Sequence, residues 1–206
     1  MRIRRGERAA YEDGARLMVV LETDRLILRH FAWDDLDDLA AIYGDPEVTR
    51  YIGNGVSKSL EHVRHILSCA MTDNARSWSP ELLARLPQLG RAIERDASFG
   101  LWATIYKPDN RLIGRCGLLS WDLDGAKEVE VGYILARAYW GKGLATEAAQ
   151  ASRDYGFNQL GFGRLISVIQ PGNRASQRVA LKNGMHLEKE TKVQDVPVHV
   201  YAIEKS

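Results

Sequence analysis

A strand, a glycine-rich turn and a helix follow one another between residues 128 and 159, and this succession limits the folds open to the chain. "EVEVGYIL" (128–135) begins with the alternation of polar and apolar residues that is typical of a strand. "YWGKGLATEAAQ" then places two glycines around Lys142 and continues into an alanine-rich helix expected at about 143–159. Strands that alternate with helices in this way predict a mixed α/β protein in which helices cover a sheet.

The remaining elements extend this pattern in both directions along the chain. The expected order is a strand at 25–31, helices at 32–45 and 58–71, a hairpin of strands at 98–122, the strand at 128–135, the helix at 143–159, a strand at 164–170, a helix at 173–184 and closing strands at 186–193 and 196–205. Residues 76–97 contain Pro87 and Gly90, which favour short helical pieces there.

Length and composition fit a single compact domain and exclude several classes of function. The chain has 206 residues, of which 45% are hydrophobic and 27% charged, and its net charge is +1. This balance gives no reason to expect nucleic acid or an anionic membrane as a partner, and no apolar run is long enough to span a bilayer. The two cysteines form no disulfide framework, so we expect a reducing, cytoplasmic environment.

The first twenty residues are expected to lie outside the main domain, which we place at 21–206. They are basic but lack the apolar core and cleavage site of a secretory signal. We expect a flexible extension, with a functional basic arm as the alternative.

The glycine turn fits neither of two familiar nucleotide-binding patterns. It lacks the G-x-x-x-x-G-K-[ST] spacing of a triphosphate loop, and Thr146 stands where a dinucleotide loop has its third glycine. Glycines before a helix allow backbone N–H groups to converge on an anion, and the helix end adds partial positive charge. The turn is therefore a candidate pyrophosphate cradle, although a tight turn without a ligand remains an alternative.

The segments "EVEVGYILARAYWGKGLATEA" and "VIQPGNRASQRVALKNGM" together resemble the GNAT superfamily of acetyl-CoA-dependent N-acetyltransferases. "LETDRLILRHFAWDDLDDLAAIYGDPEVTRYIG" is similar to the branch that contains the ribosomal-protein N-terminal acetyltransferases. The resemblance covers about residues 21–204, with 76–97 as an insertion near the acceptor cleft. This insertion is expected to line or cap the cleft, with a dimer contact as the alternative. It implies a central mixed, mostly antiparallel sheet, splayed between the strands at 128–135 and 164–170, with helices on both faces.

The resemblance also implies a cofactor site. The family pattern [QR]-x-x-G-x-[GA] matches residues 140–145 here, with tryptophan replacing the usual first residue. The side chain of Lys142 either contacts phosphate or lies in solvent. The residues expected to bind acetyl-CoA, as co-substrate, are Val131, Gly132, Tyr133, Trp140, Gly141, Lys142, Gly143, Leu144, Ala145, Thr146, Asn173 and Ser176.

Glu130 is the candidate general base. Transfer to an amine requires the neutral amine, whose ordinary pKa is near 10. Alternation places Glu128 and Glu130 on one face of the strand, and that strand leads to the glycine turn. In the family, a glutamate before "[IV]GY" often activates the amine. A solvated strand glutamate is the alternative. The resemblance assigns oxyanion stabilisation to a backbone N–H between residues 129 and 134.

Asn173 and Ser176 form an N-x-x-S sequence at the start of the next helix. Asn173 is a good N-cap, and the resemblance adds contact with the pantetheine arm of the cofactor. Many family members have a tyrosine general acid seven residues after the asparagine, but Ala180 stands there. Ser176 is the candidate to hydrogen-bond or protonate the leaving thiolate, and cofactor positioning is its alternative role.

Three other groups of residues are candidates for a site. His62, His65 and Cys69 share one helix face, but a zinc site would need further ligands, so we expect no metal. Cys116 lies in an apolar strand and is expected to be a buried thiol. The third group is an acidic run made of Asp34, Asp35, Asp37 and Asp38. It is expected to start a helix and face solvent, and attraction of a cationic acceptor is the alternative.

The expected function is direct transfer of an acetyl group from acetyl-CoA to a primary amine, in a ternary complex without a covalent enzyme intermediate. The acceptor is a protein N-terminus or a small-molecule amine, and the chain is expected to be a monomer or homodimer. A non-catalytic acyl-CoA sensor of the same fold is the main alternative, and another nucleotide binder is a third.

Overall fold

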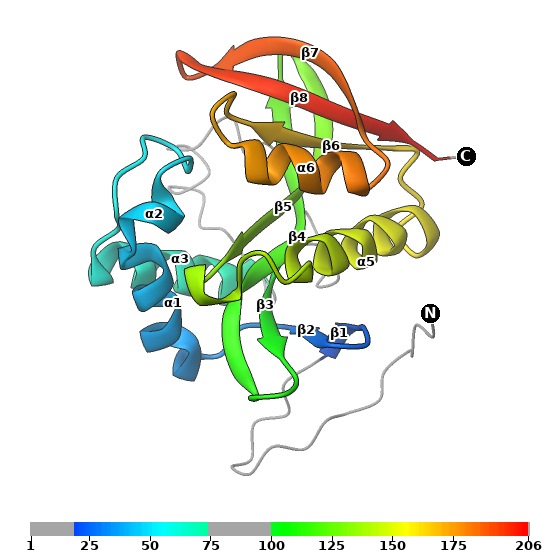
Figure 1. Cartoon of the computed structure of the whole chain (residues 1–206). Helices are drawn as coiled ribbons and strands as arrows, with labels where there is room; N and C mark the ends of the chain where they lie inside the picture. Colours follow the sequence, from blue (N-terminus) through cyan, green and yellow to red (C-terminus); the bar gives the residue numbers. More distant parts are fainter. Residues whose placement is uncertain (1–18, 74–99, 206) are drawn as a thin grey trace.

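A computed structural model describes residues 19–73 and 100–205 of the chain, which form an open sheet of eight strands in the order β1-β2-β3-β4-β5-β6-β8-β7 (Figure 1). The strands are β1 (Val19–Glu22), β2 (Leu26–Arg29), β3 (Leu101–Tyr106), β4 (Arg111–Leu123), β5 (Ala126–Leu135), β6 (Arg164–Ile169), β7 (His186–Val193) and β8 (Val196–Glu204). The helices are α1 (Leu36–Gly44), α2 (Pro46–Thr49), α3 (Leu60–Asp73), α5 (Leu144–Asn158) and α6 (Arg174–Lys182), with short 3-10 helices at Trp33–Asp35 and Arg137–Tyr139.

The sheet opens between β5 and β6. β4 and β5 pair continuously from Gly114 opposite Leu135 to Leu123 opposite Ala126. β5 and β6 run parallel and pair only where Glu130 lies opposite Ile166, and Figure 1 shows them diverging toward α2 and the glycine turn. The other strand pairs are antiparallel. The predicted mixed, mostly antiparallel sheet, splayed between these two strands, is confirmed.

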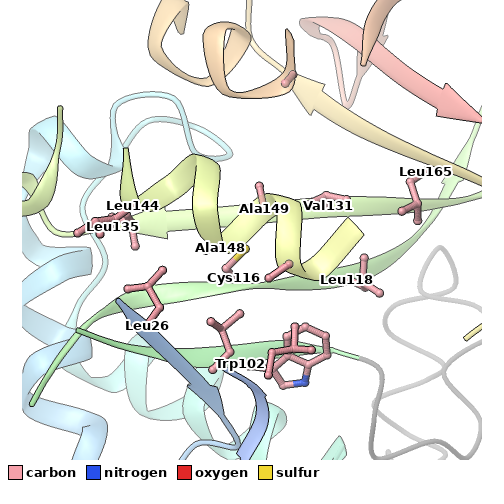
Figure 2. Packing of buried hydrophobic residues seen from close by; sticks show 14 of the residues in the cluster. Leu26, Trp102, Cys116, Leu118, Val131, Leu135, Leu144, Ala148, Ala149 and Leu165 are labelled. Carbon is pink, nitrogen blue, oxygen red and sulfur yellow. The ribbon is translucent and has the colours of Figure 1, made fainter. Parts of the chain in front are cut away.

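Helices cover both faces of the sheet, as predicted. Small residues of α5, among them Ala148 and Ala149, are fully buried and allow the helix to pack closely on β4 and β5 (Figure 2). α1 and α3 pack with Ala103 and Ile105 of β3 in a second cluster of buried side chains. Within the described residues, no helix is both long and apolar enough to cross a membrane.

Several details differ from the sequence prediction. β1 was not predicted; it pairs with β2 and begins at Val19, within the segment expected to be an extension. The short helix α2 was not predicted; it follows α1 directly, with Asp45 as its cap and Pro46 as its first residue. Residues 1–18 and 76–97 lie outside the described part of the chain, so the extension and the insertion stay predictions.

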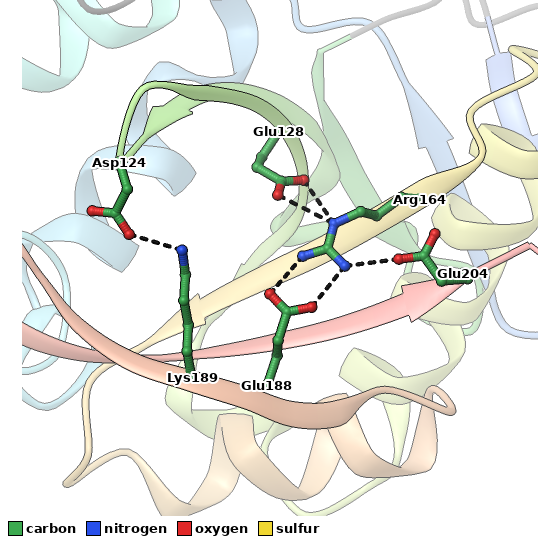
Figure 3. A network of polar contacts seen from close by, with 6 residues as sticks. All are labelled: Asp124, Glu128, Arg164, Glu188, Lys189 and Glu204. Atoms are coloured by element: carbon green, nitrogen blue, oxygen red, sulfur yellow. Dashed lines mark hydrogen bonds and ion pairs between the residues drawn. The ribbon is translucent and has the colours of Figure 1, made fainter.

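Arg164 joins four strands at the end of the sheet where β5 and β6 meet. Its guanidinium contacts Glu128 of β5 at 3.1 Å, and Glu188 of β7 and Glu204 of β8 at 2.8 Å each (Figure 3). These hydrogen bonds and charges raise the pKa of Arg164, although burial opposes the rise. The network ties β5 to β7 and β8 close to the end from which the splay opens.

Candidate active site

Two adjoining cavities lie at the splay. The first, here called the turn cavity, has a volume of about 690 Å³ and is lined by the glycine turn, the start of α5, α6 and the segment that follows α2. The second, the sheet cavity, has a volume of about 510 Å³ and is lined by β4, β5, β6 and the β7–β8 hairpin. The residues that line both are Tyr51, Ile52, Tyr133, Ile134, Asn173 and Ser176.

The glycine turn presents free backbone donors to the turn cavity. Gly141 and Gly143 have φ angles of +74° and +77°, a left-handed conformation that favours glycine. The N–H of Glu147 donates to the Gly143 carbonyl at 3.1 Å, which is the first hydrogen bond of the helix. The N–H groups of residues 144–146 precede that bond and have no partner within α5. This is the geometry expected of an anion cradle.

An ion pair between Arg25 and Glu147 lies against the glycine turn. Arg25 donates to the Lys142 carbonyl at 2.9 Å, and its Nε contacts Glu147 Oε2 at 2.6 Å. Burial alone would raise the pKa of Glu147, but hydrogen bonds from Thr23 and from the Arg25 backbone and side chain outweigh it and lower that pKa. This contact was not predicted, because Arg25 and Glu147 lie far apart in the chain.

Trp140 and Lys142 have separate places around the turn. The Trp140 indole donates to the Leu135 carbonyl at 2.7 Å, which fixes the turn to the end of β5, and Trp140 lines the turn cavity. Lys142 is not among the residues that line this cavity; its ammonium lies 5.0 Å from the centre of the Tyr139 ring. Of the predicted cofactor residues in this segment, the structure therefore brings all but Lys142 to one cavity.

Glu130 is buried rather than solvated. It is 8% exposed and lines the sheet cavity with its neighbours Val131 and Gly132. Its carboxylate accepts hydrogen bonds from the Val168 N–H, at 3.1 Å, and from the Trp121 indole. Burial raises the pKa of Glu130, and these two hydrogen bonds and the charge of Arg115 only partly oppose the rise. The carboxylate is therefore a stronger base than that of an exposed glutamate and better suited to accept a proton from an amine.

The N-x-x-S sequence lies at the junction of the two cavities. Asn173 caps α6, as predicted, because its side chain accepts a hydrogen bond from the Ser176 N–H at 3.1 Å. Tyr133 donates from its hydroxyl to the Ser176 carbonyl at 3.1 Å, and burial is the main cause that raises its pKa. Ala180 is 1% exposed and lines neither cavity.

Several lining residues were not predicted from the sequence. Tyr51 lies over the turn before α6, where a Cβ on Gly172 would come within 2.8 Å of its ring. Arg115 and Trp121 on β4 line the sheet cavity beside Glu130. A further set recurs every four residues on α6 and adds positive charge to the turn cavity: Arg174, Arg178 and Lys182. The four-residue spacing of these basic side chains is visible in the sequence and could have been recognised there. No pattern in the sequence pointed to Tyr51 or Arg115.

The other candidate groups lie elsewhere. Cys116 is a buried thiol, as predicted, and burial raises its pKa to about 12, which leaves it inert as a nucleophile. Asp35 does not face solvent as predicted; it is buried and forms an ion pair with Arg29 at 2.7 Å. Cys69 lies 3.7 Å from His65, and the described residues contain no group of three or more metal-binding side chains.

Comparison with known proteins identifies the family. A family model described as an acetyltransferase (GNAT) domain matches residues 25–186. The uncharacterized protein YkkB of Bacillus subtilis (strain 168) is 41% identical over 88% of this chain and 93% of its own length. The uncharacterized N-acetyltransferase p20 of Bacillus licheniformis is 30% identical over 86% of this chain and 87% of its own length.

A solved structure supports the same assignment at the level of fold. RimL, a ribosomal L7/L12 alpha-N-protein acetyltransferase in complex with coenzyme A, has a TM-score of 0.63 and 16% identity, covering 91% of this chain and 98% of RimL. The splayed sheet and the family match both confirm the resemblance found in the sequence. The chain belongs to the GNAT family of N-acetyltransferases.

Proposed function

We propose that the chain transfers the acetyl group of acetyl-CoA directly to a primary amine, with both substrates bound together at the splay. The observation that carries the proposal is the pair of adjoining cavities, one lined by free helix N–H groups and the other by a buried carboxylate. The coenzyme A complex of RimL, which shares the fold, is consistent with it.

The turn cavity is the proposed site of acetyl-CoA, which supplies an activated acetyl thioester. The N–H groups of residues 141–146 would bind its pyrophosphate, because a helix N-terminus favours negative charge. Arg174, Arg178 and Lys182 would contribute positive charge nearby. Asn173 and Ser176 would contact the pantetheine arm where the two cavities meet.

Glu130 is the proposed general base, acting on the amine directly or through a water molecule. Its burial in the sheet cavity and its raised pKa support this role. The amine would approach from the sheet cavity, which lies across Tyr133 and Ser176 from the turn cavity. Proton removal and acetyl transfer would then take place where the cavities join.

The open edge of β5 offers a donor for the developing oxyanion. The Val131 carbonyl faces β6, because it accepts a hydrogen bond from the Ser167 hydroxyl at 2.9 Å. Alternate residues of a strand direct their N–H groups to the same side, so the N–H of Tyr133 faces β6 as well. Tyr133 lies beyond the last position where β5 and β6 pair, which leaves this N–H as the proposed donor. Ser176 is the proposed hydrogen-bond donor to the leaving thiolate.

Release of coenzyme A in the presence of acetyl-CoA and a panel of primary amines tests the proposal. Glu130→Gln should lower kcat by about 100-fold or more, as expected for loss of a general base, while acetyl-CoA still binds. Glu128→Gln is the matched control, because Glu128 lies on the same face of β5 but contacts Arg164 outside the sheet cavity.

Three outcomes separate the alternatives. Turnover that depends on Glu130 but not on Glu128 supports the proposed base. Equal turnover by wild type and Glu130→Gln would show that another group accepts the proton. Binding of acetyl-CoA without turnover of any amine would favour the acyl-CoA sensor.

A further inference from the structure

We propose that Arg115 forms an anion-binding subsite of the sheet cavity, so that the preferred acceptor is an amine that also carries a carboxylate, such as an amino acid. This inference rests on the proposed function and specifies the acceptor at the same site. Arg115 lies on β4 opposite Ile134 of β5, and it lines the sheet cavity together with Glu130.

Arg115 has no carboxylate partner among the described residues. Its Nε is buried without a hydrogen-bond partner, and its guanidinium lies 5.2 Å from the centre of the Tyr43 ring. Other arginines on the strands, such as Arg29 and Arg164, form ion pairs with carboxylates. A guanidinium presents five donors in a planar fork, so stacking on a ring still leaves its donors available to an anion.

Arg115 and Glu130 lie on the same face of the sheet. Glu130 is opposite Leu119 on β4, and Arg115 is four residues from Leu119 along that strand, about 13 Å at 3.3 Å per residue. Paired residues of an antiparallel sheet point to the same side, as do residues an even number of positions apart. Both side chains therefore lie on the face of the sheet that borders the sheet cavity, at separate positions along β4 and β5.

The charges of the sheet cavity favour a molecule that carries both a positive and a negative group. Among the described residues that line it, Arg115 and Glu130 are the charged ones, and most of the others are apolar, such as Leu119 and Val198. In a cavity of low polarity, an unpaired cation is costly and an incoming carboxylate that pairs with it is favoured. A substrate ammonium group near Glu130 and a carboxylate near Arg115 satisfy both. A polyamine would instead place a second positive charge against Arg115.

Matched acceptors that differ by one carboxylate test the subsite. The pairs are leucine with isoamylamine, γ-aminobutyrate with propylamine, and ε-aminocaproate with pentylamine, so that the distance between the amine and the carboxylate also varies. For the best pair, kcat/KM of the wild type should favour the carboxylate-bearing member by roughly 10- to 100-fold, the range of a charge-assisted hydrogen bond. Each value is corrected for the fraction of free amine.

Arg115→Met keeps an unbranched apolar stem and removes the guanidinium and its charge. The preference should fall to within a few-fold of unity in this variant, because kcat/KM falls much more for the acid than for the carboxylate-free amine. Loss of the Arg115 charge also acts on Glu130, but it affects both members of a pair alike and leaves their ratio unchanged. Arg115→Lys should restore part of the preference. Arg111→Met is the matched control: Arg111 lies on the same strand, is 66% exposed and pairs with Asp38 away from the cavity. It should leave the preference unchanged.

Failure of the subsite and failure of the proposed function give different results. Turnover without a carboxylate preference, or a preference that persists in Arg115→Met, overturns the subsite and leaves the acetyltransferase intact. Absence of acetyl-CoA binding to the wild type overturns the proposed function itself. A short peptide with Asp as its second residue, compared with its Asn counterpart, shows whether the carboxylate comes from a polypeptide. A preference confined to such peptides would overturn the amino acid as acceptor.

Discussion

At the scale of single residues, the environment of Glu130 determines what the site can do. Burial favours the protonated carboxyl group, whereas the Trp121 indole and the Val168 N–H favour the carboxylate. The balance leaves the pKa of Glu130 above its ordinary value of 4.5. A base of this kind loses its proton at a higher pH than an exposed glutamate, and the rate of the bound complex should follow that titration.

Trp121→Phe should move the acid limb of the kcat–pH profile to higher pH. The substitution removes a hydrogen bond that stabilises the carboxylate, so the pKa of Glu130 rises further and a higher pH is needed to form the base. The measurement is kcat at saturating acetyl-CoA and amine across the acid range. A limb that stays in place in Trp121→Phe, or one that survives in Glu130→Gln, would assign the titration to another group.

At the scale of elements, the glycine turn joins β5 to α5 and depends on residues that are distant in sequence. The left-handed conformation of Gly141 and Gly143 turns the chain, the Trp140 indole fixes the turn to β5, and the Arg25 side chain holds its outer carbonyl. The free N–H groups at the start of α5 are thereby held in place before a ligand arrives.

Gly143→Ala should weaken binding of acetyl-CoA and lower the free energy of unfolding by about 1–2 kcal/mol, the cost of a left-handed conformation for a residue with a Cβ. Space is not the obstacle, since the nearest atom to a Cβ there is 3.6 Å away. Gly163→Ala is the control, because Gly163 has open space and no positive φ. Calorimetric titration and denaturant unfolding measure the two effects, and equal behaviour of the two variants would contradict this account.

Arg25→Met should raise the Kd of acetyl-CoA several-fold while leaving the chain folded. The variant loses the contacts with the Lys142 carbonyl and Glu147, so the turn is less firmly held when the ligand binds. Arg153→Met is the control. Arg153, like Arg25, forms an ion pair with an acidic residue of α5, here Asp154, but it lines neither cavity. An unchanged Kd in Arg25→Met would show that the turn holds its shape without this clamp.

At the scale of the whole molecule, the sequence predicted the order of the elements and the splay better than the lining of the site. Periodicity and glycine positions are local signals, so the helices and strands that flank the turn were predicted from them. The contacts of Arg25 with Glu147, and of Arg115 with the sheet cavity, join segments that only the folded chain brings together. Edge strand β1 was missed because four residues carry little periodicity.

Arg164→Met should lower the free energy of unfolding near neutral pH by about 1–2 kcal/mol, between the values for exposed and buried ion pairs. It leaves Glu128, Glu188 and Glu204 close together without their cation. Arg164 lowers the pKa of Glu188 in the folded chain, so its stabilisation is present above the ordinary glutamate pKa and is lost as pH falls through the folded value.

The difference between wild type and Arg164→Met should therefore shrink below about pH 4.5, the ordinary glutamate value. Denaturant unfolding at several pH values measures it. Lys189→Met is the control, since its single ion pair with Asp124 is more exposed and should contribute less than about 1 kcal/mol. A pH-independent difference would mean that packing, and not charge, accounts for the effect of Arg164.

Thermal unfolding with and without acetyl-CoA tests the central claim most directly. A ligand at a hundred times its Kd stabilises by about 2.7 kcal/mol, which for a chain of this length is a rise in Tm of roughly 5–10 °C. We predict this rise with acetyl-CoA, none with ATP or NAD, its loss in Gly143→Glu and its retention in Gly163→Glu. A folded protein whose Tm does not change at saturating acetyl-CoA would contradict the assignment of the turn cavity as the cofactor site.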